Sequence, residues 1–317
     1  MTKRGPKVSI LIPTYNQEAF LADCIESALQ QTYENLEIVI SDDASTDRTG
    51  EVARRFLADR RVRYHRNVEN IGRVANYRSL LNVLASGDWV LMLDGDDYLI
   101  NRRYVANAMS LALSTPDIVL VFGKLWQGQD VSTATLCNTG ARVQAVWEGI
   151  RFFLEHPPFS SLHPLHMTCL FRRPAAINAD CYRHDILSSD FESFYRLMLG
   201  HKIAFLDEVA GLWRQHANNT SRTAGHLALV RNFRAFVGPY KYARSLGILS
   251  RSELKRWLHG CIARYYRGCF DRLWAADRRW DALRLTVRVL MIDMGTMRDP
   301  GVRASLSRLL GVSGRRH

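Results

Sequence analysis

An apolar run that ends in a dense acidic cluster constrains this chain more than any other stretch. Residues 89–93, WVLML, have the length and bulk of a buried strand, and Asp94, Gly95, Asp96 and Asp97 follow at once. Three carboxylates this close repel one another, but they become favourable around a hard divalent cation such as Mg²⁺ or Mn²⁺. A solvated acidic turn that caps the next helix is the alternative interpretation. The position directly after a buried strand favours the metal site.

Apolar segments of strand length recur along the first part of the chain, beginning near residues 8, 36, 62, 89 and 118. Segments with helical periodicity separate them, and this spacing of about 27 residues is typical of an α/β fold with a parallel sheet. Ligands of such sheets bind at the carboxyl ends of the strands. Polar residues follow three of these ends, at positions 14–16, 42–43 and 94–97. We therefore expect the three clusters to form one site.

Two common nucleotide-binding motifs are absent. No strand is followed by GxGxxG, and there is no GxxxxGK[ST], so neither a dinucleotide fold nor a P-loop is supported. A nucleotide at this site would be held by a metal on its phosphates and by side chains on its base.

The middle of the chain is less regular. Residues 127–140 are polar and predict a loop, and HPPFSSLHPLH at 156–166 holds three histidines whose spacing fits no standard zinc site. Residues 166–171, 203–206 and 209–213 predict further short strands. Asp190 directly precedes a predicted helix over 191–199, at its N-cap or first turn, where a simple capping role is the alternative to a catalytic one.

The positive charge of the chain is concentrated in its last third. Residues 222–317 carry 20 Lys and Arg against 6 Asp and Glu, whereas the first 221 residues carry 23 and 25. Two predicted helices, over 252–273 and 279–294, mix Trp, Tyr, Leu and Val with many arginines. This pattern indicates either a helical subdomain with a basic solvated face or a surface that lies on anionic lipid. No nucleic-acid-binding motif accompanies the charge, so we do not expect a nucleic acid partner.

Composition and cysteine usage indicate the compartment. The 47% of hydrophobic residues is enough for a full core, and the six cysteines form no CxxC, as expected of free thiols in a reduced cytosol. No window has the apolar length of a membrane span, and the apolar stretch near the start is too short for a secretory signal. We expect a cytoplasmic protein, with peripheral contact to the inner face of the cytoplasmic membrane left open.

Three motifs in order carry a resemblance to a known family: VSILIPTYNQEAFLADCIESALQQTYENLEIVISDDASTDRT, NIGRVANYRSLLNVLASGDWVLMLDGDDYL and SSDFESFYRLMLGHKIAFLDEVAGLWRQHANNTS. In this order and spacing they resemble the family 2 glycosyltransferases of the GT-A fold, which invert configuration and use nucleotide-sugars. The resemblance runs from Val8 to Ser221. It implies a GT-A domain over 1–221, with a nucleotide-sugar-binding half (1–123) and an acceptor and catalytic half (124–221), followed by a basic helical subdomain over 222–317.

The resemblance also implies roles for single residues. Tyr15 would stack on the donor base, and Asp43 would accept a hydrogen bond from a ring N–H of the kind that uracil and thymine offer. Asp190 would be the catalytic base. The full donor-binding set is Pro13, Thr14, Tyr15, Asn16, Glu18, Asp43, Asn70, Arg73, Asn76, Asp94 and Gly95. The implied metal ligands, for Mn²⁺ or Mg²⁺, are Asp94, Asp96, Asp97 and His216, with Asp96 the direct one. Arg214, His216 and Ser221 would belong to a loop that closes over the diphosphate.

The sequence departs from the family pattern at two places. Ser189 stands where a second acid often precedes the base, and Trp213 stands where a tyrosine often precedes the Arg-x-His. No QxxRW motif is present, which argues against a processive synthase. The expected reaction moves one sugar from a UDP- or dTDP-sugar to a hydroxyl of a growing surface polysaccharide, with a lipid-linked acceptor left open. A sugar nucleotidyltransferase, or an inactive scaffold that binds glycan or membrane, remains the alternative.

Overall fold

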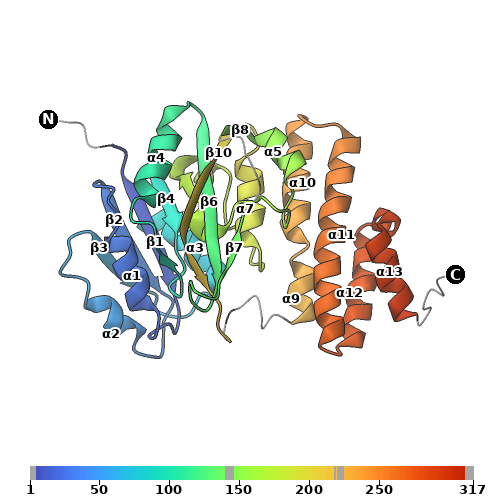
Figure 1. The fold of residues 1–317 in the computed structure, drawn as a ribbon, viewed down its shortest axis with the longest axis horizontal. Helices are drawn as coiled ribbons and strands as arrows, with labels where there is room; N and C mark the ends of the chain where they lie inside the picture. Colours follow the sequence, from blue (N-terminus) through green and yellow to red (C-terminus); the bar gives the residue numbers. More distant parts are fainter. Residues whose placement is uncertain (1–4, 140–145, 218, 220–224, 311–317) are drawn as a thin grey trace.

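The centre of the molecule is one mixed sheet with the strand order β3-β2-β1-β4-β9-β6-β10-β5, to which β7 adds on β6 and β8 on β10 (Figure 1). The computed structural model describes residues 5–139, 146–217, 219 and 225–310. The strands are β1 (Val8–Thr14), β2 (Leu36–Asp42), β3 (Val62–Arg66), β4 (Trp89–Met92), β5 (Tyr98–Leu99), β6 (Ile118–Gly128), β7 (Thr135–Cys137), β8 (Val146–Glu148), β9 (Leu170–Arg172) and β10 (Lys202–Arg214).

The five expected strands are all present, and the mostly parallel sheet is confirmed. β1 pairs in parallel with β2 and β4, β2 with β3, and β6 with β10. Short β9 lies antiparallel between β4 and β6, so the sheet is mixed at its middle. The predicted strand over 166–171 is a 3₁₀ turn, η2 (His166–Thr168), followed by β9. The two short strands predicted over 203–213 are one strand with register shifts, and part of the predicted loop over 127–140 forms β7.

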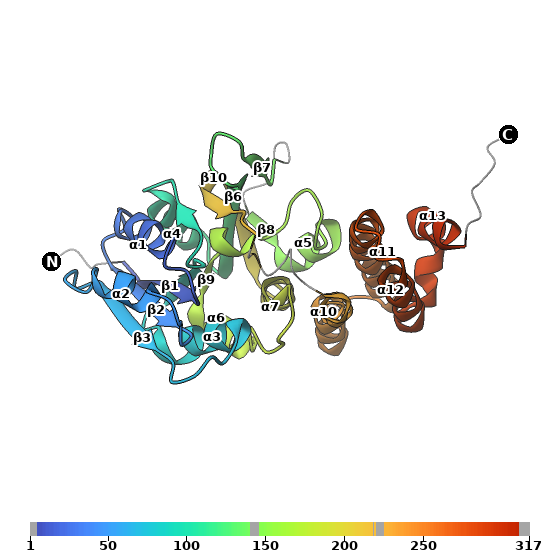
Figure 2. The ribbon, with the colours of Figure 1, turned by 90° about the horizontal axis from the view of Figure 1, so that it is seen from below.

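Helices cover both faces of the sheet (Figure 2). α1 and α4 pack on one face through apolar stripes that belong to one core cluster. α3 and α6 pack on the other face, and their apolar stripes belong to a second core cluster. The helical segment after β3 changes at Leu80 from α-helix to a π-helical turn, η1. The helices of this part are α1 (Leu21–Leu29), α2 (Thr49–Arg54), α3 (Arg73–Ser79), η1 (Leu80–Leu84), α4 (Tyr104–Ser114), α5 (Gly149–Glu155), α6 (Arg173–Asn178) and α7 (Ser189–Leu197).

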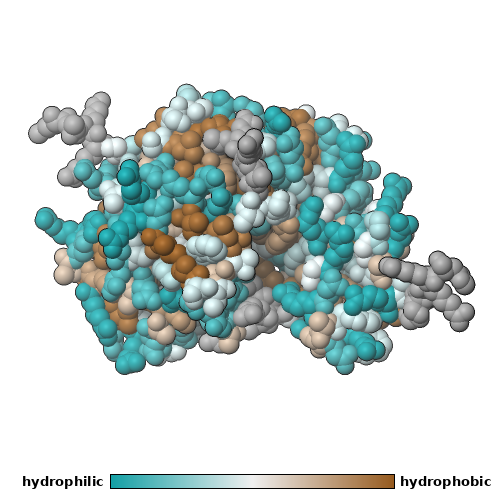
Figure 3. All heavy atoms as spheres, in the orientation of Figure 1, coloured by the Kyte–Doolittle hydropathy of each residue, from teal (hydrophilic) through white to brown (hydrophobic). Residues whose placement is uncertain are grey.

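The C-terminal part is helical, as predicted, and lies at the far end of the molecule from β3 (Figure 1). Most of its surface on the face drawn in Figure 3 is hydrophilic. The predicted boundary at Arg222 lies outside the described residues. None of the helices in the described ranges is long and apolar enough to cross a membrane. The elements are α9 (His226–Arg231), α10 (Arg234–Leu246), α11 (Arg251–Ala275), α12 (Arg279–Ile292), η3 (Met294–Arg298) and α13 (Pro300–Leu309).

These helices share a hydrophobic core with the sheet part rather than forming one of their own. Trp257 of α11 stacks on Phe153 of α5 with ring centroids 4.1 Å apart, and its indole Nε1 donates to the Phe153 carbonyl at 2.7 Å. One contiguous cluster of buried side chains runs from α3 and β6 through α7 into α10, α11 and α12. The C-terminal helices are therefore part of the structural support of α7. All six cysteines are free thiols, as predicted.

Candidate active site

The three polar clusters that the sequence analysis singled out lie side by side at the carboxyl ends of β1, β2 and β4. Strand pairing places Thr14 opposite Asp42, and the Thr14 carbonyl accepts from Asp43 N at 2.9 Å. On the other side of β1, the Pro13 carbonyl accepts from Gly95 N at 3.1 Å. The backbone ladder thus continues past the strand ends, and the convergence expected from the topology is present.

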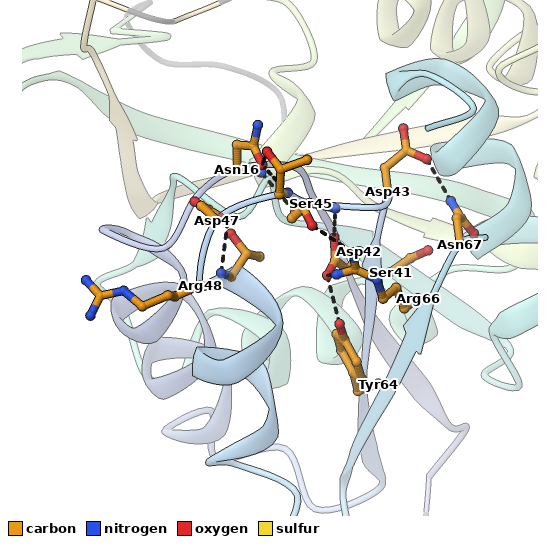
Figure 4. A network of polar contacts seen from close by, with 12 residues as sticks. Asn16, Ser41, Asp42, Asp43, Ser45, Asp47, Arg48, Tyr64, Arg66 and Asn67 are labelled. Carbon is orange, nitrogen blue, oxygen red and sulfur yellow. Dashed lines mark hydrogen bonds and ion pairs between the residues drawn. The ribbon is translucent and has the colours of Figure 1, made fainter. Parts of the chain in front are cut away.

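Asp43 is buried and anchors the loop that leads to α3 (Figure 4). Its Oδ1 accepts from Asn67 Nδ2 at 2.8 Å and from Ile71 N at 2.9 Å, and its Oδ2 accepts from Gly72 N at 2.9 Å. A carboxylate offers about four lone-pair sites, so one acceptor site on Oδ2 is left for a ligand. The neighbouring Asp42 is fully buried and accepts from Ser45 N, Tyr64 Oη and Arg66 Nη1, so it holds the protein together rather than facing a ligand.

Tyr15 and Asn16 follow β1, and the Tyr15 side chain is exposed whereas the Asn16 side chain is hydrogen-bonded within the protein. The Tyr15 ring is 45% exposed, as a platform for a stacked base requires. Asn16 has a φ of 51°, a left-handed conformation that asparagine tolerates, and its Oδ1 accepts from Thr46 N at 2.8 Å. Glu18 accepts from Arg48 N at 2.8 Å, and this bond lowers the pKa of Glu18. Asn16 and Glu18 therefore both hold the loop over 45–48, and Figure 4 shows Asn16 beside that loop.

Three predicted donor contacts come from the loop and helix after β3. Asn76 is 1% exposed, and its amide exchanges two hydrogen bonds with Ser41 of β2, so it fixes the sheet rather than facing a ligand. Asn70 is exposed and accepts from Gly72 N at 3.1 Å. Arg73 reaches across to the segment before α7, where its Nη2 donates to the carbonyls of Ile186 and Leu187 at 3.1 and 3.0 Å.

The carboxylate of Asp94 contacts two aromatic side chains, Tyr77 and His166. Its Oδ1 accepts from Tyr77 Oη at 2.7 Å, and its Oδ2 lies 3.7 Å from His166 Nδ1. Burial alone would raise the pKa of Asp94, but His166, Tyr77 and the Arg73 guanidinium outweigh it and lower the pKa. Asp94 is therefore the carboxylate of the cluster that the protein itself keeps charged.

Asp96 and Asp97 meet the end of β10. Asp96 Oδ2 lies 2.8 Å from His216 Nε2, and Asp97 Oδ1 accepts from Arg214 N at 2.9 Å. Burial and the neighbouring carboxylates raise the pKa of Asp96 and, more strongly, of Asp97. The protein supplies too little positive charge here to neutralise three acids.

Arg214 and His216 also pack against the start of α1. The Arg214 guanidinium lies between the rings of Phe20 and Tyr98, 4.9 and 5.0 Å from their centroids, and its Nη2 donates to Asp23 at 2.9 Å. The His216 ring stacks on Phe20 at 4.8 Å. These contacts keep the end of β10 against Asp96 and Asp97. Ser221, the third predicted residue of the closing loop, lies outside the described residues.

The acidic cluster has a donor set that fits a hard divalent cation only if other ligands complete it. Among the described residues, no group of three or more His, Cys, Asp or Glu side chains is arranged to hold a metal ion. Asp96 and His216 form a pair of donors, with Asp94 and Asp97 adjacent in the chain. Mg²⁺ and Mn²⁺ are commonly bound by one or two protein ligands, with phosphate oxygens and waters as the others. The excess of carboxylate over cationic groups fits such an ion.

Asp190 lies in the first turn of α7 and is partly exposed. Within the described residues its carboxylate has no hydrogen bond or ion pair, which leaves it free for a ligand. Burial alone would lower the pKa of Arg73, but Tyr77, Asp94 and Asp190 raise it, so Arg73 lies within electrostatic reach of both acids. Burial lowers the pKa of the His163 imidazole, and the Asp190 carboxylate opposes that effect.

Glu192, the other acid of this turn, is in a different position. It is fully buried, and Arg196 of the same helix donates to both of its oxygens, at 2.8 and 2.7 Å. A carboxylate committed in this way cannot take a proton from an incoming hydroxyl. Of the two acids, only Asp190 has the access that a catalytic base needs.

Several residues of the site were missed by sequence reasoning. Tyr77 and His166 contact Asp94, Phe20 supports the end of β10, and Asn232 binds the first turn of α7. Only His166 had a signal in the sequence, because it belongs to the histidine-rich stretch at 156–166. A hollow of about 460 Å³ between Trp89, Ala112 and Arg172 lies at the opposite ends of the strands and holds none of the candidate residues.

The sheet and its flanking helices form a GT-A fold, and the acids lie together at the strand ends. Residues 9–164 match the family model described as Glycosyl transferase family 2. This match covers almost half of the chain.

Relatives and solved structures agree with this assignment. GlyG of Streptococcus pneumoniae serotype 4, a glycosyltransferase, is 38% identical over 91 residues, which are 28% of this chain and 30% of GlyG. EpsE of Bacillus subtilis, a putative glycosyltransferase, is 41% identical over 101 residues, 31% of this chain and 36% of EpsE. The matching segment thus spans about a third of these relatives.

Two solved structures share the fold over nearly the whole chain. S. aureus TarS 1–349, in complex with UDP-GlcNAc, has a TM-score of 0.70 and 16% identity, with 96% of this chain and 89% of that chain covered. The mannosyltransferase PcManGT of Pyrobaculum calidifontis, in complex with GDP-Man and Mn²⁺, has a TM-score of 0.57 and 17% identity, with coverage of 98% and 76%. At this identity the likeness shows the fold alone, and it includes the C-terminal helices.

Proposed function

We propose that this chain is an inverting glycosyltransferase that moves one sugar from a nucleoside-diphosphate sugar to a hydroxyl of a glycan or lipid-linked acceptor. The observation that carries the proposal is the chain of contacts that joins the two acidic groups. Arg73 lies over the Tyr77 ring, Tyr77 binds Asp94, and Arg73 also binds the carbonyls just before the Asp190 turn. A diphosphate at Asp94 and a base at Asp190 would thus be held on one scaffold.

The donor would bind along the carboxyl ends of β1, β2 and β4. The exposed Tyr15 ring offers its base a stacking surface, and the open lone pair on Asp43 Oδ2 suits a ring N–H, which favours a UDP- or dTDP-sugar. The complex of TarS with UDP-GlcNAc supports a uridine nucleotide as the first to test. Arg73 is the cationic side chain within reach of Asp94 and Asp190, between donor and acceptor.

Asp190 would act as general base. It takes the proton of the acceptor hydroxyl while that oxygen forms a bond to the anomeric carbon, and the bond from the anomeric carbon to the diphosphate oxygen breaks. Attack from the side opposite the leaving group inverts the anomeric configuration. A divalent cation held by Asp96 and His216, with Asp94 and Asp97 beside them, would neutralise charge on the departing nucleoside diphosphate.

The two roles are separated by two variants. Asp190→Asn should bind UDP as the wild type does but lower transfer by roughly 10²- to 10⁴-fold, because it removes the general base. Asp96→Asn should lose metal-dependent donor binding. Asp185→Asn, five residues earlier and exposed, is the matched control and should change neither. Transfer by Asp190→Asn at a near-normal rate would move the base elsewhere.

A lipid-linked acceptor and an anionic membrane surface belong to the same proposal. They rest on the basic C-terminal helices, which carry 20 Lys and Arg against 6 Asp and Glu over residues 222–317.

A further inference from the structure

Helix α12 has two apolar faces, and only one of them is covered. Its buried residues, which include Ala282, Leu285 and Val289, pack toward the shared core. Trp280, Leu283, Val287 and Met291 are instead 75%, 39%, 48% and 71% exposed. At about 100° per residue these four side chains fall within a sector of about 80°, opposite the buried one. We call them the outer stripe.

The outer stripe is larger than the scattered apolar residues usual on a protein surface. Two further apolar side chains at the end of the helix are exposed, Ile292 at 40% and Met294 at 76%. A contiguous apolar stripe of this length marks a surface that contacts something other than water.

The charges beside the outer stripe are basic. Arg284 and Arg288 lie along one edge, both exposed, and Arg279 lies at the start of the helix. Arg284 is 64% exposed and reaches Asp281 only at 3.6 Å, so its charge remains available. The stripe therefore sits on the part of the chain that carries 20 Lys and Arg against 6 Asp and Glu.

We propose that the outer stripe of α12 binds the surface of an anionic lipid bilayer. Trp280, Val287 and Met291 would enter the boundary between headgroups and acyl chains, and Arg284 and Arg288 would contact lipid phosphates. An exposed Trp on an apolar face with arginines alongside is the arrangement that interfacial helices use. Charge complementarity selects this occupant, because a phosphate-rich surface matches the arginines.

A second copy of the chain fits less well. In a two-fold dimer with antiparallel α12 helices, the edge that carries Arg284 and Arg288 would meet the same edge of the second copy. Like charges across an apolar contact are unfavourable, whereas anionic lipid pairs with all of them.

Lipid binding by α12 would also act on the active site, because side-chain contacts link α12 through α9 to the start of α7. Asp281 of α12 lies 3.1 Å from His226 Nδ1 of α9, and Asn232 at the end of α9 binds Ser188 just before Asp190. Lipid binding by α12 would thus hold the acceptor side of the site next to the membrane. The lipid contact itself does not depend on the proposed transfer reaction.

The test measures flotation of the full chain with vesicles of phosphatidylcholine, with and without phosphatidylglycerol. We expect binding only when phosphatidylglycerol is present, with weakening at high salt. A Trp280→Ser, Met291→Ser double variant should lose more than about tenfold in partition coefficient, since each side chain buries apolar area in the bilayer. An Arg284→Gln, Arg288→Gln double variant should lose about fivefold per arginine. Val83→Ser, at a 74% exposed valine of η1, is the control.

Three results would overturn the proposal. These are no binding of the wild type to anionic vesicles, unchanged binding of both double variants, and a dimer in light scattering that the outer-stripe variant turns into a monomer. UDP binding, measured on the same samples, reports on the proposed function separately, because all the substituted residues lie outside the donor site.

Discussion

Replacing Asn232 by alanine tests whether the C-terminal helices hold the catalytic base in place. Asn232 ends α9 and is 1% exposed. Its Oδ1 accepts from Ser188 N at 2.7 Å, and its Nδ2 donates to Ser188 Oγ at 3.0 Å. Ser188 precedes the first residue of α7, two positions before Asp190. One buried side chain thus fixes both the backbone and the hydroxyl that set the start of this helix.

The expected cost follows from these two hydrogen bonds. Alanine leaves the Ser188 N–H and hydroxyl buried without their partner, and each unpaired buried group costs about 1–3 kcal/mol. We therefore expect Asn232→Ala to lower the free energy of unfolding by about 2–4 kcal/mol. The first turn of α7 would also relax, and a shift of about 1 Å at a catalytic group can lower a rate by about 10²-fold.

The assay compares unfolding in urea, UDP binding and sugar transfer in the same preparations. Asn232→Ala should lose transfer while it keeps UDP affinity, because the donor side of the site rests on β1, β2 and β4. Asn178→Ala, at an exposed asparagine that ends α6, is the matched control and should change none of the three. Full transfer activity in a folded Asn232→Ala protein would refute the idea that α9 positions Asp190.

Three further predictions concern the sheet and the donor. Gly211→Ala should destabilise the protein by about 1–3 kcal/mol in urea unfolding and weaken Mn²⁺-dependent UDP binding, since a Cβ there collides with the Tyr98 carbonyl and Leu99 Cα next to the acidic cluster. Unchanged unfolding would contradict this. Burial alone would raise the pKa of Glu37, but hydrogen bonds from Lys7, Ser9 and Ser86 lower it to about 2. The lowered pKa contributes about 3 kcal/mol of stability that is present above about pH 5 and lost as the pH falls toward 2, so the gap in unfolding free energy between wild type and Glu37→Gln should shrink on acidification. A gap of constant size would show that Glu37 keeps its ordinary pKa. Tyr15→Ala should weaken UDP binding by about 1–3 kcal/mol in calorimetry without changing the melting temperature, because the ring is exposed; unchanged affinity would place the base elsewhere.

The strands of the first half could be predicted because each buried strand of a parallel sheet is a short apolar run with a polar end. β1, β2 and β4 have this pattern, and it was enough to group residues 14–16, 42–43 and 94–97 at one edge. The antiparallel insertion of β9 could not be predicted, because three residues carry no periodicity and its place depends on pairing with β4 and β6.

The candidate site could be predicted in its acids but not in their supports. Asp43, Asp94 and Asp190 stand in recognisable motifs, whereas Tyr77 and Asn232 are ordinary helix residues whose roles arise from contacts 17 and 44 positions away. Asn76 was expected to contact the donor, but its side chain points inward and hydrogen-bonds with Ser41. The outer stripe of α12 was hidden because the helix is apolar on two sides, so its sequence has no single apolar face.

The most direct test of the central claim is calorimetric titration of UDP, dTDP, GDP and CMP into the wild type and Asp96→Asn, each with and without Mn²⁺. We expect that one nucleoside diphosphate, with UDP or dTDP favoured, binds to the wild type only when Mn²⁺ is present and does not bind to Asp96→Asn. Failure of all four nucleotides to bind to the wild type, or equal binding to the variant, would contradict a donor site at residues 94–97.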